Sequence, residues 1–413
     1  MPETETILPQ WWPEAAQAVE GLKEELIRLR RHFHQHPELS HQERRTAAAV
    51  ASYLKKLGLD VATGIAGHGV VGRLAGSSPG RTVAWRADMD ALPLTEEVQV
   101  PWRSKNAGVM HACGHDFHLA IALGAAALLS RFREHLSGEV RFIFQPAEEG
   151  PPQGPDSGAL GMVRAGVLDN PRVEAVFGLH VAPTLDVGQV RYCPEVVMAG
   201  SEHLILTVAG QVAHGATPHK GVDPILAAAQ TLVVLKSALS QEVDSRQPFV
   251  LTFGRIEGGN RFNILADKVV LEGSLRFLSP GVRERVLAAV RRHLAGLAKA
   301  TGARLDLTTR GIYPILKNDA RLTDRAVQIL RECLGARRVT AHQPAMGSED
   351  FAYFAQEVPA FYFFLGVRTP GTRGQALHSP DFNPDEGALT VGVKAAAALL
   401  VGTAESGAQA PAG

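Results

Sequence analysis

The stretch that most constrains the fold and chemistry of this chain runs from His111 to His118 and reads HACGHDFH. It holds three imidazoles and one thiol. Cys113 and His115 stand two residues apart, so in an extended or loop backbone both side chains leave the same side. A thiolate together with imidazoles suits zinc and similar borderline metals. A chance cluster of histidines on a solvated loop is the alternative, and the added cysteine favours a metal site.

An apolar run follows this segment at once, from Leu119 to Leu129, and predicts a buried helix that anchors the ligand loop. Strands and helices alternate through about residue 195, which predicts an α/β domain built on a mostly parallel sheet. Ligands of such sheets bind at the carboxyl ends of the strands. Earlier in the chain, Ser40 followed by Glu43 predicts a capping box that opens a helix.

Residues of metal-ligand type follow three of the predicted strands: Asp88 with Asp90, Glu148 with Glu149, and His180. Adjacent carboxylates are costly when both are buried and ionised, and a nearby dication offsets that cost. The two aspartates fit a solvated turn equally well. A lone histidine after a strand is ordinarily a core residue, but here it is the third strand end that finishes in a ligand type.

Five strong ligand candidates result: Cys113, His115, Glu149, His180 and His378. A structural zinc closes with four ligands, so the surplus predicts two metal ions with a shared ligand. Such a site activates a water molecule and polarises a carbonyl oxygen, and it needs a base nearby. Glu148 stands beside a ligand but outside the ligand set, and fits that role. The predicted reaction class is metal-assisted hydrolysis of an amide or ester.

Two other interpretations use the same residues. Cys113, flanked by histidines, can serve as a thiolate nucleophile. A metal-binding or metal-delivery module is the alternative without catalysis. A carrier needs neither a base at Glu148 nor a large second domain, so these two features distinguish an enzyme from a carrier.

A second domain is predicted from about Ala199, where the elements follow the order strand, helix, strand, strand, helix, strand. This order is that of a split βαβ, ferredoxin-like α+β sandwich. We therefore predict a catalytic domain in two parts, residues 1–198 and 311–413, with a smaller domain at 199–310 inserted between them.

Length and composition support this organisation and exclude some partners. A chain of 413 residues exceeds one ordinary core, and two domains are expected. The formal net charge is +0, without a basic stripe, which argues against binding to nucleic acid or to an anionic membrane. Three widely spaced cysteines do not form a disulfide framework, and no apolar run is long enough to span a membrane. We therefore expect a cytoplasmic protein.

With these motifs assembled, the chain resembles the zinc amidohydrolase and peptidase family of aminoacylases and carboxypeptidase-like enzymes. The branch it is most similar to contains hippurate hydrolases, N-acyl-L-amino-acid amidohydrolases and auxin-conjugate hydrolases. The matching stretches follow one another through nearly the whole chain: HPELSHQE (36–43), WRADMDALPL (85–94), MHACGHDFHLA (110–120), FQPAEEG (144–150), GLHV (178–181), AHGATPHKGVDPI (213–225), GSEDFAYF (347–354) and LHSPDFNPDE (377–386).

The resemblance implies the same five ligands, with Glu148 as general base, and adds residues from the smaller domain. It implies that His214 reaches the active site of a partner subunit and stabilises the developing oxyanion. It also implies that Asn263 and Arg276 hold the α-carboxylate of the substrate, for which the planar guanidinium of arginine is suited. The smaller domain is expected to act as a lid and to form a homodimer or higher homo-oligomer.

The chain shares one departure from the wider family with its own branch. Many relatives have histidine at the position of Asp88 and an acid at the position of Cys113. We therefore expect Asp88 and Asp90 to orient histidine ligands rather than to bind metal. The expected cofactors are two divalent ions per subunit, zinc first, with manganese, cobalt or nickel as alternatives.

The expected reaction is hydrolysis of an N-acyl-L-amino acid to a carboxylate and a free amino acid. Glu148 takes the proton of the attacking water and returns it to the leaving amine, while metal and His214 stabilise the oxyanion. A carboxypeptidase or dipeptidase of the same family is the alternative. The sequence leaves the acyl group open.

Overall fold

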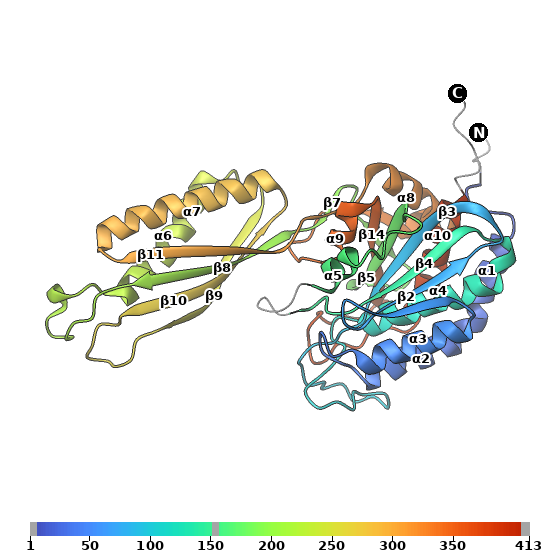
Figure 1. Cartoon of the computed structure of the whole chain (residues 1–413), viewed down its shortest axis with the longest axis horizontal. Coiled ribbons are helices and arrows are strands. Elements are labelled where there is room, and N and C mark those ends of the chain that lie inside the picture. The colour runs from blue at the N-terminus through green and yellow to red at the C-terminus, as the bar shows by residue number, and fades with distance from the viewer. Residues whose placement is uncertain (1–5, 151–156, 406–413) are drawn as a thin grey trace, which may run out of the picture. The chain divides into compact units, whose positions relative to one another are not determined.

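The computed structural model describes residues 6–150 and 157–405 of the chain (Figure 1). The chain divides into two compact units. Unit 1 comprises Met1–Val197, Lys317–Gln343 and Asp350–Gly413, and unit 2 comprises Met198–Leu316 and Pro344–Glu349.

Unit 1 is built on a mixed sheet in which eight described strands follow the order β1-β2-β4-β3-β5-β14-β6-β13. The neighbours β4, β3, β5 and β14 are mutually parallel, whereas β2 and β6 pair antiparallel with this central group. The predicted α/β class with a mostly parallel sheet is therefore confirmed. The strands are β1 (Asp60–Ile65), β2 (Gly69–Ala75), β3 (Ser78–Asp88), β4 (Ser137–Gln145), β5 (Ala175–Asp186), β6 (Val190–Tyr192), β13 (Val339–Ala341) and β14 (Ala360–Arg368).

Helices cover this sheet, and α4 and α10 pack against it and against each other. Side chains alternate along β3 as a strand requires. Val83, Trp85 and Ala87 join the large apolar core, whereas Arg86 between them stacks its guanidinium on Phe351. The helices of unit 1 are α1 (Trp12–Ala18), α2 (Lys23–Gln35), α3 (Arg44–Lys56), α4 (His115–Arg131), α5 (Gly158–Arg164), α8 (Ala320–Leu334), α9 (Ala352–Glu357) and α10 (Ala388–Ala404).

Helix α4 begins at His115 and is buried from there through Leu129, as the apolar run predicted. A helix that is apolar all round belongs in a core, where neighbours on every side remove it from water. Its first turn is therefore held rigidly, and this turn carries the histidines of the ligand loop.

A buried ion network ties α2 to the start of α4. Arg30 Nε donates to Asp116 Oδ2 at 2.8 Å. His34 lies between two carboxylates, with Nδ1 2.8 Å from Asp116 Oδ2 and Nε2 3.1 Å from Glu96 Oε1. Burial alone would raise the pKa of Asp116, but Arg30 and His34 outweigh it and hold that pKa below its usual range. Each charge is thus buried with a partner, as burial demands.

Removing Asp116 will test this network, because it leaves Arg30 buried without its closest partner. We expect Asp116→Ala to lower the unfolding free energy of the metal-free protein by about 3 kcal/mol or more. The measurement is the denaturant midpoint followed by tryptophan fluorescence. Asp244→Ala, which removes an exposed ion pair with Arg246, is the matched control and should leave the midpoint unchanged. Equal midpoints for the two variants would contradict the assignment.

Unit 2 has the element order β8, α6, β9, β10, α7, β11 and the sheet order β11-β8-β10-β9, antiparallel throughout. This is the split βαβ arrangement predicted for the inserted region. On β10 every second residue is buried, and helices α6 and α7 contact this strand. The elements are β8 (Gly200–Ala209), α6 (Pro224–Glu242), β9 (Phe249–Gly258), β10 (Lys268–Phe277), α7 (Pro280–Thr301) and β11 (Arg304–Tyr313). Strands β7 (Val196–Met198) and β12 (Leu316–Lys317) pair where the chain passes between the units.

The predicted capping box at Ser40 and Glu43 is wrong. Helix α3 begins at Arg44, and the first backbone N–H groups of this helix are capped by Glu38, which accepts from Arg45 and Thr46 at 3.1 and 2.8 Å. The side chains of Ser40 and Glu43 make other hydrogen bonds, described with the site. Strand β1 had no sequence signal, because its residues are largely exposed and do not alternate. None of the helices in residues 6–150 and 157–405 has the length and apolarity to cross a membrane.

Candidate metal centre

The turn between Cys113 and His115 depends on Gly114. Its φ of 87° lies in the left-handed region, and a Cβ at this position would stand 2.4 Å from Val181 Cγ2. Only glycine tolerates both the conformation and the close approach. The turn places Cys113 just before α4 and His115 at its first residue, so both side chains are fixed by the buried helix.

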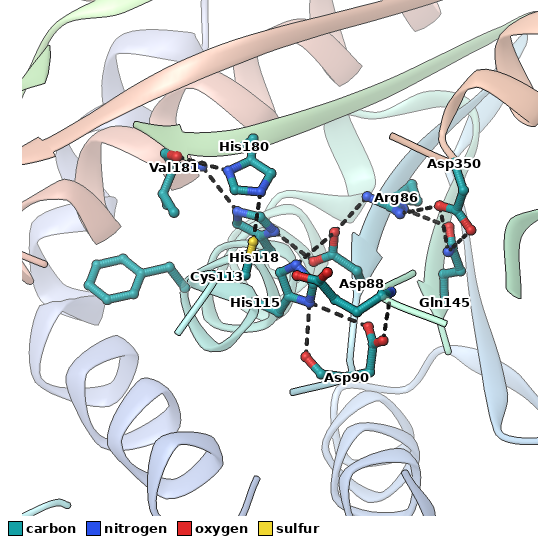
Figure 2. Close-up of polar contacts among 12 residues, drawn as sticks. Arg86, Asp88, Asp90, Cys113, His115, His118, Gln145, His180, Val181 and Asp350 are labelled. Atoms are coloured by element: carbon teal, nitrogen blue, oxygen red, sulfur yellow. Dashed lines mark hydrogen bonds and ion pairs between the residues drawn. The ribbon is translucent and has the colours of Figure 1, made fainter. Parts of the chain in front are cut away.

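Two histidines of α4 differ in how their ring nitrogens are used (Figure 2). His115 Nδ1 lies 2.9 Å from the Asp90 carbonyl oxygen and donates to it, so Nε2 is the nitrogen that can bind a metal ion once it is deprotonated. That Nε2 is buried and has no hydrogen-bond partner among the described residues. His118 instead donates from Nδ1 to Asp88 Oδ1 at 2.6 Å and accepts the Val181 N–H at Nε2 at 3.1 Å. His115 therefore has a nitrogen available for a metal ion, and His118 has both nitrogens engaged.

The other predicted ligands gather around the Cys113 sulfur. His180 Nε2 lies 3.3 Å from Sγ, and His378 Nε2 lies 3.2 Å from it. His378 Nε2 is also 3.2 Å from Glu149 Oε1. His180 Nδ1 lies 2.8 Å from the Val181 carbonyl oxygen and donates to it, so Nε2 is the nitrogen that faces Cys113, as Figure 2 shows.

These donors form overlapping groups whose ligand atoms lie within 4.8 Å of one another. Cys113 with His115 and His180 is one group, and Cys113 with Glu149 and His378 is another. The structure thus brings all five candidates of the sequence analysis together, with Cys113 common to both groups. Glu148 belongs to a third group, with His115 and Glu149.

Asp88 and Asp90 lie beside the donors, and each accepts a hydrogen bond from a histidine. Asp88 is the last residue of β3, and the Asp90 carbonyl oxygen orients His115. His180 is placed differently from expectation. Strand β5 does not end before His180 but continues to Asp186, because β14 pairs with it along this length.

The charge balance of the site suits a cation. Burial raises the pKa of the Cys113 thiol well above its ordinary value, and the Glu149 and Glu148 carboxylates add to the effect. Burial acts to lower the pKa of His115, but Asp88 and Asp90 outweigh it and raise that pKa to about 10. Without a metal ion, these two residues therefore keep protons that the surrounding acids require. A dication would supply the same positive charge, so the donors present fit a metal ion.

A second network behind Asp88 was missed by the sequence analysis. Arg86 Nη1 donates to Asp88 Oδ2 at 2.6 Å, and Nη2 donates to Asp350 Oδ1 at 2.8 Å (Figure 2). Gln145 Nε2 donates to both oxygens of Asp350 at 2.8 Å. The four side chains are buried. The signal available in the sequence was Arg86 itself, a charged residue inside an apolar strand.

His111, the first histidine of the loop, lies outside the donor groups found among the described residues. It is buried, and burial lowers its pKa to about 4, so the ring is neutral. Of the four candidates in the ligand loop, the structure places Cys113 and His115 together in one group, and His118 in another group with Asp88 and His115.

The remaining candidates lie in unit 2. His214 and Asn263 are exposed and adjacent, because His214 bridges to Ile264 and the Gly215 N–H donates to the Asn263 carbonyl oxygen at 2.8 Å. Arg276 lies on β10 and is half-buried. Its Nε donates to Ser274 Oγ at 3.1 Å and its Nη1 to Ser348 Oγ at 2.6 Å.

Comparison with known proteins identifies the family. Residues 84–401 match Peptidase family M20/M25/M40. The chain is 38% identical over 387 residues to thermostable carboxypeptidase 2 of Saccharolobus solfataricus, covering 93% of this chain and 96% of that protein. It is 37% identical over 370 residues to N-acetyl-L-cysteine deacetylase of Bacillus subtilis, covering 89% of this chain and 85% of that protein. The crystal structure of the YXEP protein of Bacillus subtilis matches with a TM-score of 0.79 at 33% identity, covering 92% of this chain and 98% of that chain. That protein is described as a dinuclear metal binding peptidase from the M20 family.

The chain therefore belongs to Peptidase family M20/M25/M40. The resemblance stated from the motifs is confirmed, and the protein is a hydrolase of this family.

Metal uptake should release protons, because the raised pKa values of Cys113 and His115 keep both groups protonated near neutral pH in the metal-free protein. We expect the apparent affinity for Zn²⁺ to rise with pH between about 6 and 8, by up to about tenfold per pH unit for each proton displaced. A titration in weak buffer with an indicator dye measures this release. Cys113→Ser should release fewer protons, whereas Cys193→Ser, which changes another free cysteine, should match the wild type. Proton release unaffected by Cys113→Ser would contradict the assignment.

Proposed function

We propose that this chain is a metal-dependent amidohydrolase that cleaves N-acyl-L-amino acids to a carboxylate and a free amino acid. The observation that carries the proposal is the position of Glu148 beside two overlapping donor groups that share Cys113. A buried carboxylate next to a complete ligand set has the placement that a general base requires.

Two divalent ions are proposed as cofactors, with Cys113, His115, Glu149, His180 and His378 as their ligands. Cys113 belongs to both donor groups and would be the shared ligand. When bound, the ions would polarise the substrate carbonyl and lower the pKa of a water molecule. The sulfur and imidazole donors favour zinc, with manganese, cobalt or nickel as alternatives. The description of the YXEP protein as a dinuclear metal binding peptidase supports the number of ions.

The protein side chains then have distinct tasks. Glu148 takes the proton of the attacking water and returns it to the leaving amine. Asp88 and Asp90 keep the imidazoles of His118 and His115 in one orientation through the contacts at 2.6 and 2.9 Å. The reaction thus needs proton transfer by the Glu148 carboxylate, and orientation of the two imidazoles by the Asp88 carboxylate and the Asp90 backbone carbonyl.

Unit 2 is proposed to supply substrate recognition. Arg276, held by the hydroxyls of Ser274 and Ser348, would receive the α-carboxylate, with Asn263 as a second contact. Both hydrogen bonds fix the plane of the guanidinium, which supports a recognition role over that of a solvated arginine. His214 is proposed to stabilise the oxyanion in the active site of a partner subunit.

Exposed apolar side chains support a dimer formed through unit 2. The large exposed hydrophobic residues of the described chain all lie in this unit: Val212, Ile225, Leu226, Val233, Val250, Ile256, Phe262 and Ile264. They lie on α6, on the edge strand β9 and beside His214 and Asn263. Grouped exposed apolar residues mark interaction surfaces. A partner subunit covering this surface would contact His214 directly.

The alternative substrate is a peptide with a free carboxyl end. The 38% sequence identity to thermostable carboxypeptidase 2 supports this alternative, and the same residues would cleave a peptide bond. We also propose a cytoplasmic location, consistent with the three free cysteines, Cys113, Cys193 and Cys333.

A substrate panel distinguishes these functions. The metal-loaded protein is incubated with N-acetyl-methionine, hippurate and a glycine-containing dipeptide, and release of free amino acid is measured. We expect release from the two acylated amino acids, and its loss after treatment with a chelator. Release from the dipeptide alone would replace the proposal with the peptidase, and no release from any substrate by a protein that retains metal would support a metal-binding module.

Glu148 is tested by substitution. We expect Glu148→Gln and Glu148→Ala to retain two metal ions and to lose about 10²–10⁴-fold in kcat, since proton transfer by a positioned side chain contributes about that much. Metal content is measured by elemental analysis of the same samples. Near-full activity in either variant with metal bound would remove Glu148 from this role.

Complementation tests the proposed role of His214 across the dimer. Glu148→Ala and His214→Ala subunits are co-expressed with different tags, and the mixed dimers are purified. Each mixed dimer would hold one site with an intact Glu148 and the partner subunit's intact His214. We therefore expect about half of the wild-type activity per mixed dimer, against almost none for either parent. Mixed dimers as inactive as their parents would show that His214 does not act in the neighbouring site.

A further inference from the structure

The loop that carries Glu148 and Glu149 begins with an uncommon backbone conformation. Ala147 has a φ of 51°, in the left-handed region that residues with a Cβ rarely adopt. Glycine would adopt it readily, but alanine needs surrounding contacts to keep it there. The direction in which Glu148 leaves the backbone depends on this residue, because Ala147 directly precedes it.

Two acids hold the loop, one on either side of Glu148. Glu43 Oε1 accepts the Ala147 N–H at 2.8 Å, and it also accepts the His41 N–H at 3.0 Å. On the other side, Asp90 Oδ2 accepts the Glu149 N–H at 2.9 Å. Asp90 Oδ2 is itself held by Ser40 Oγ, which donates to it at 2.6 Å. The loop is therefore fixed at the residue before Glu148 and at the residue after it.

The burial of Glu43 is not explained by its helix. Glu43 precedes α3, yet no side-chain hydrogen bond from it caps that helix, and Glu38 accepts the backbone N–H groups of Arg45 and Thr46 instead. Glu43 is 0% exposed, and its Oε2 has no hydrogen-bond partner among the described residues. Burial, together with the charge of Asp90, raises the pKa of Glu43 to about 7. Burial of this carboxyl group is energetically unfavourable, and its oxygen Oε1 accepts hydrogen bonds from the loop, at Ala147, and from His41.

We propose that Glu43 is a positioning residue that fixes Ala147 in its left-handed conformation and thereby aims the Glu148 carboxylate. The inference rests on the proposed role of Glu148 as base. Glu43 acts only through the backbone of the loop. Because the Glu149 N–H donates to Asp90 and not to Glu43, loss of Glu43 should displace the base while the neighbouring ligand stays in place. Small displacements matter here, since an error of about 1 Å in a reacting group can reduce the rate about 10²-fold.

Three substitutions separate geometry from charge. Glu43→Ala removes the acceptor of the Ala147 N–H, and we expect kcat to fall about 10- to 100-fold while KM changes less than about threefold. Glu43→Gln keeps a carbonyl oxygen at the same reach, so activity should return to within about threefold of the wild type. Glu43→Asp keeps the charge but is one methylene shorter, so kcat should remain low.

Measurements other than activity complete the test. Elemental analysis should find two metal ions in all three variants. Hydrogen–deuterium exchange of the peptide containing Ala147, in the metal-free protein, should be faster in Glu43→Ala than in Glu43→Gln. Glu38→Ala is the matched control, since it removes the cap of α3 without a side-chain contact to the loop. It should lower the melting temperature but leave kcat unchanged.

The outcomes distinguish this inference from the proposed function. Wild-type kcat in Glu43→Ala and Glu43→Asp, beside an inactive Glu148→Ala, would overturn the positioning role and leave the function intact. An equal loss of kcat in Glu38→Ala would show a general structural effect and would overturn it as well. An active Glu148→Ala variant would show instead that Glu148 is not the general base. Should Glu43→Ala fail to fold, the contrast between Glu43→Asp and Glu43→Gln still decides the question.

Discussion

Compensation of buried negative charge is the constraint on which the centre of unit 1 depends. Asp88, Asp90, Asp116 and Glu148 are all buried, and each would be destabilising in that position without positive charge or hydrogen-bond donors. Arg30 and Arg86 supply fixed charges on two sides of the site. On the side of the donor groups, compensation comes from protons on His115 and Cys113 or from metal ions, which explains why a metal centre and its supporting arginines occur together.

The sequence was informative where residue chemistry is distinctive. Cysteine and histidine at HACGHD point to a metal site whatever the fold, and ligand-type residues after predicted strands added the other three candidates, which the structure places near Cys113 and His115. The network of Arg86, Asp350 and Gln145 could not be predicted, because a charged residue in an apolar strand marks Arg86 but does not identify its partners, and only the sheet shows that the three are buried together. Their meeting joins positions 264 residues apart, which no local pattern encodes.

Local rules also failed where tertiary contacts offered a better partner. Ser40 and Glu43 match a capping box. In the structure, however, the Ser40 hydroxyl donates to the Asp90 carboxylate, and the Glu43 carboxylate accepts the Ala147 N–H. The competing principle is that buried polar groups of the site must be satisfied first, while an exposed helix end can use another acid. The parallel sheet and the inserted unit were predictable because long, strongly periodic elements depend little on such competition.

The place of β14 in the sheet has a consequence for how the protein is made. β14 (Ala360–Arg368) lies between β5 and β6, so the sheet of unit 1 stays interrupted until the ribosome has passed residue 368. Unit 2 is nearly one continuous stretch, and its sheet is complete once residue 313 has emerged. Because domains generally fold as units during synthesis, the sheet of unit 2 can form before that of unit 1 is complete. The nascent chain can therefore hold a complete sheet in unit 2 before His378 becomes available to the donors around Cys113.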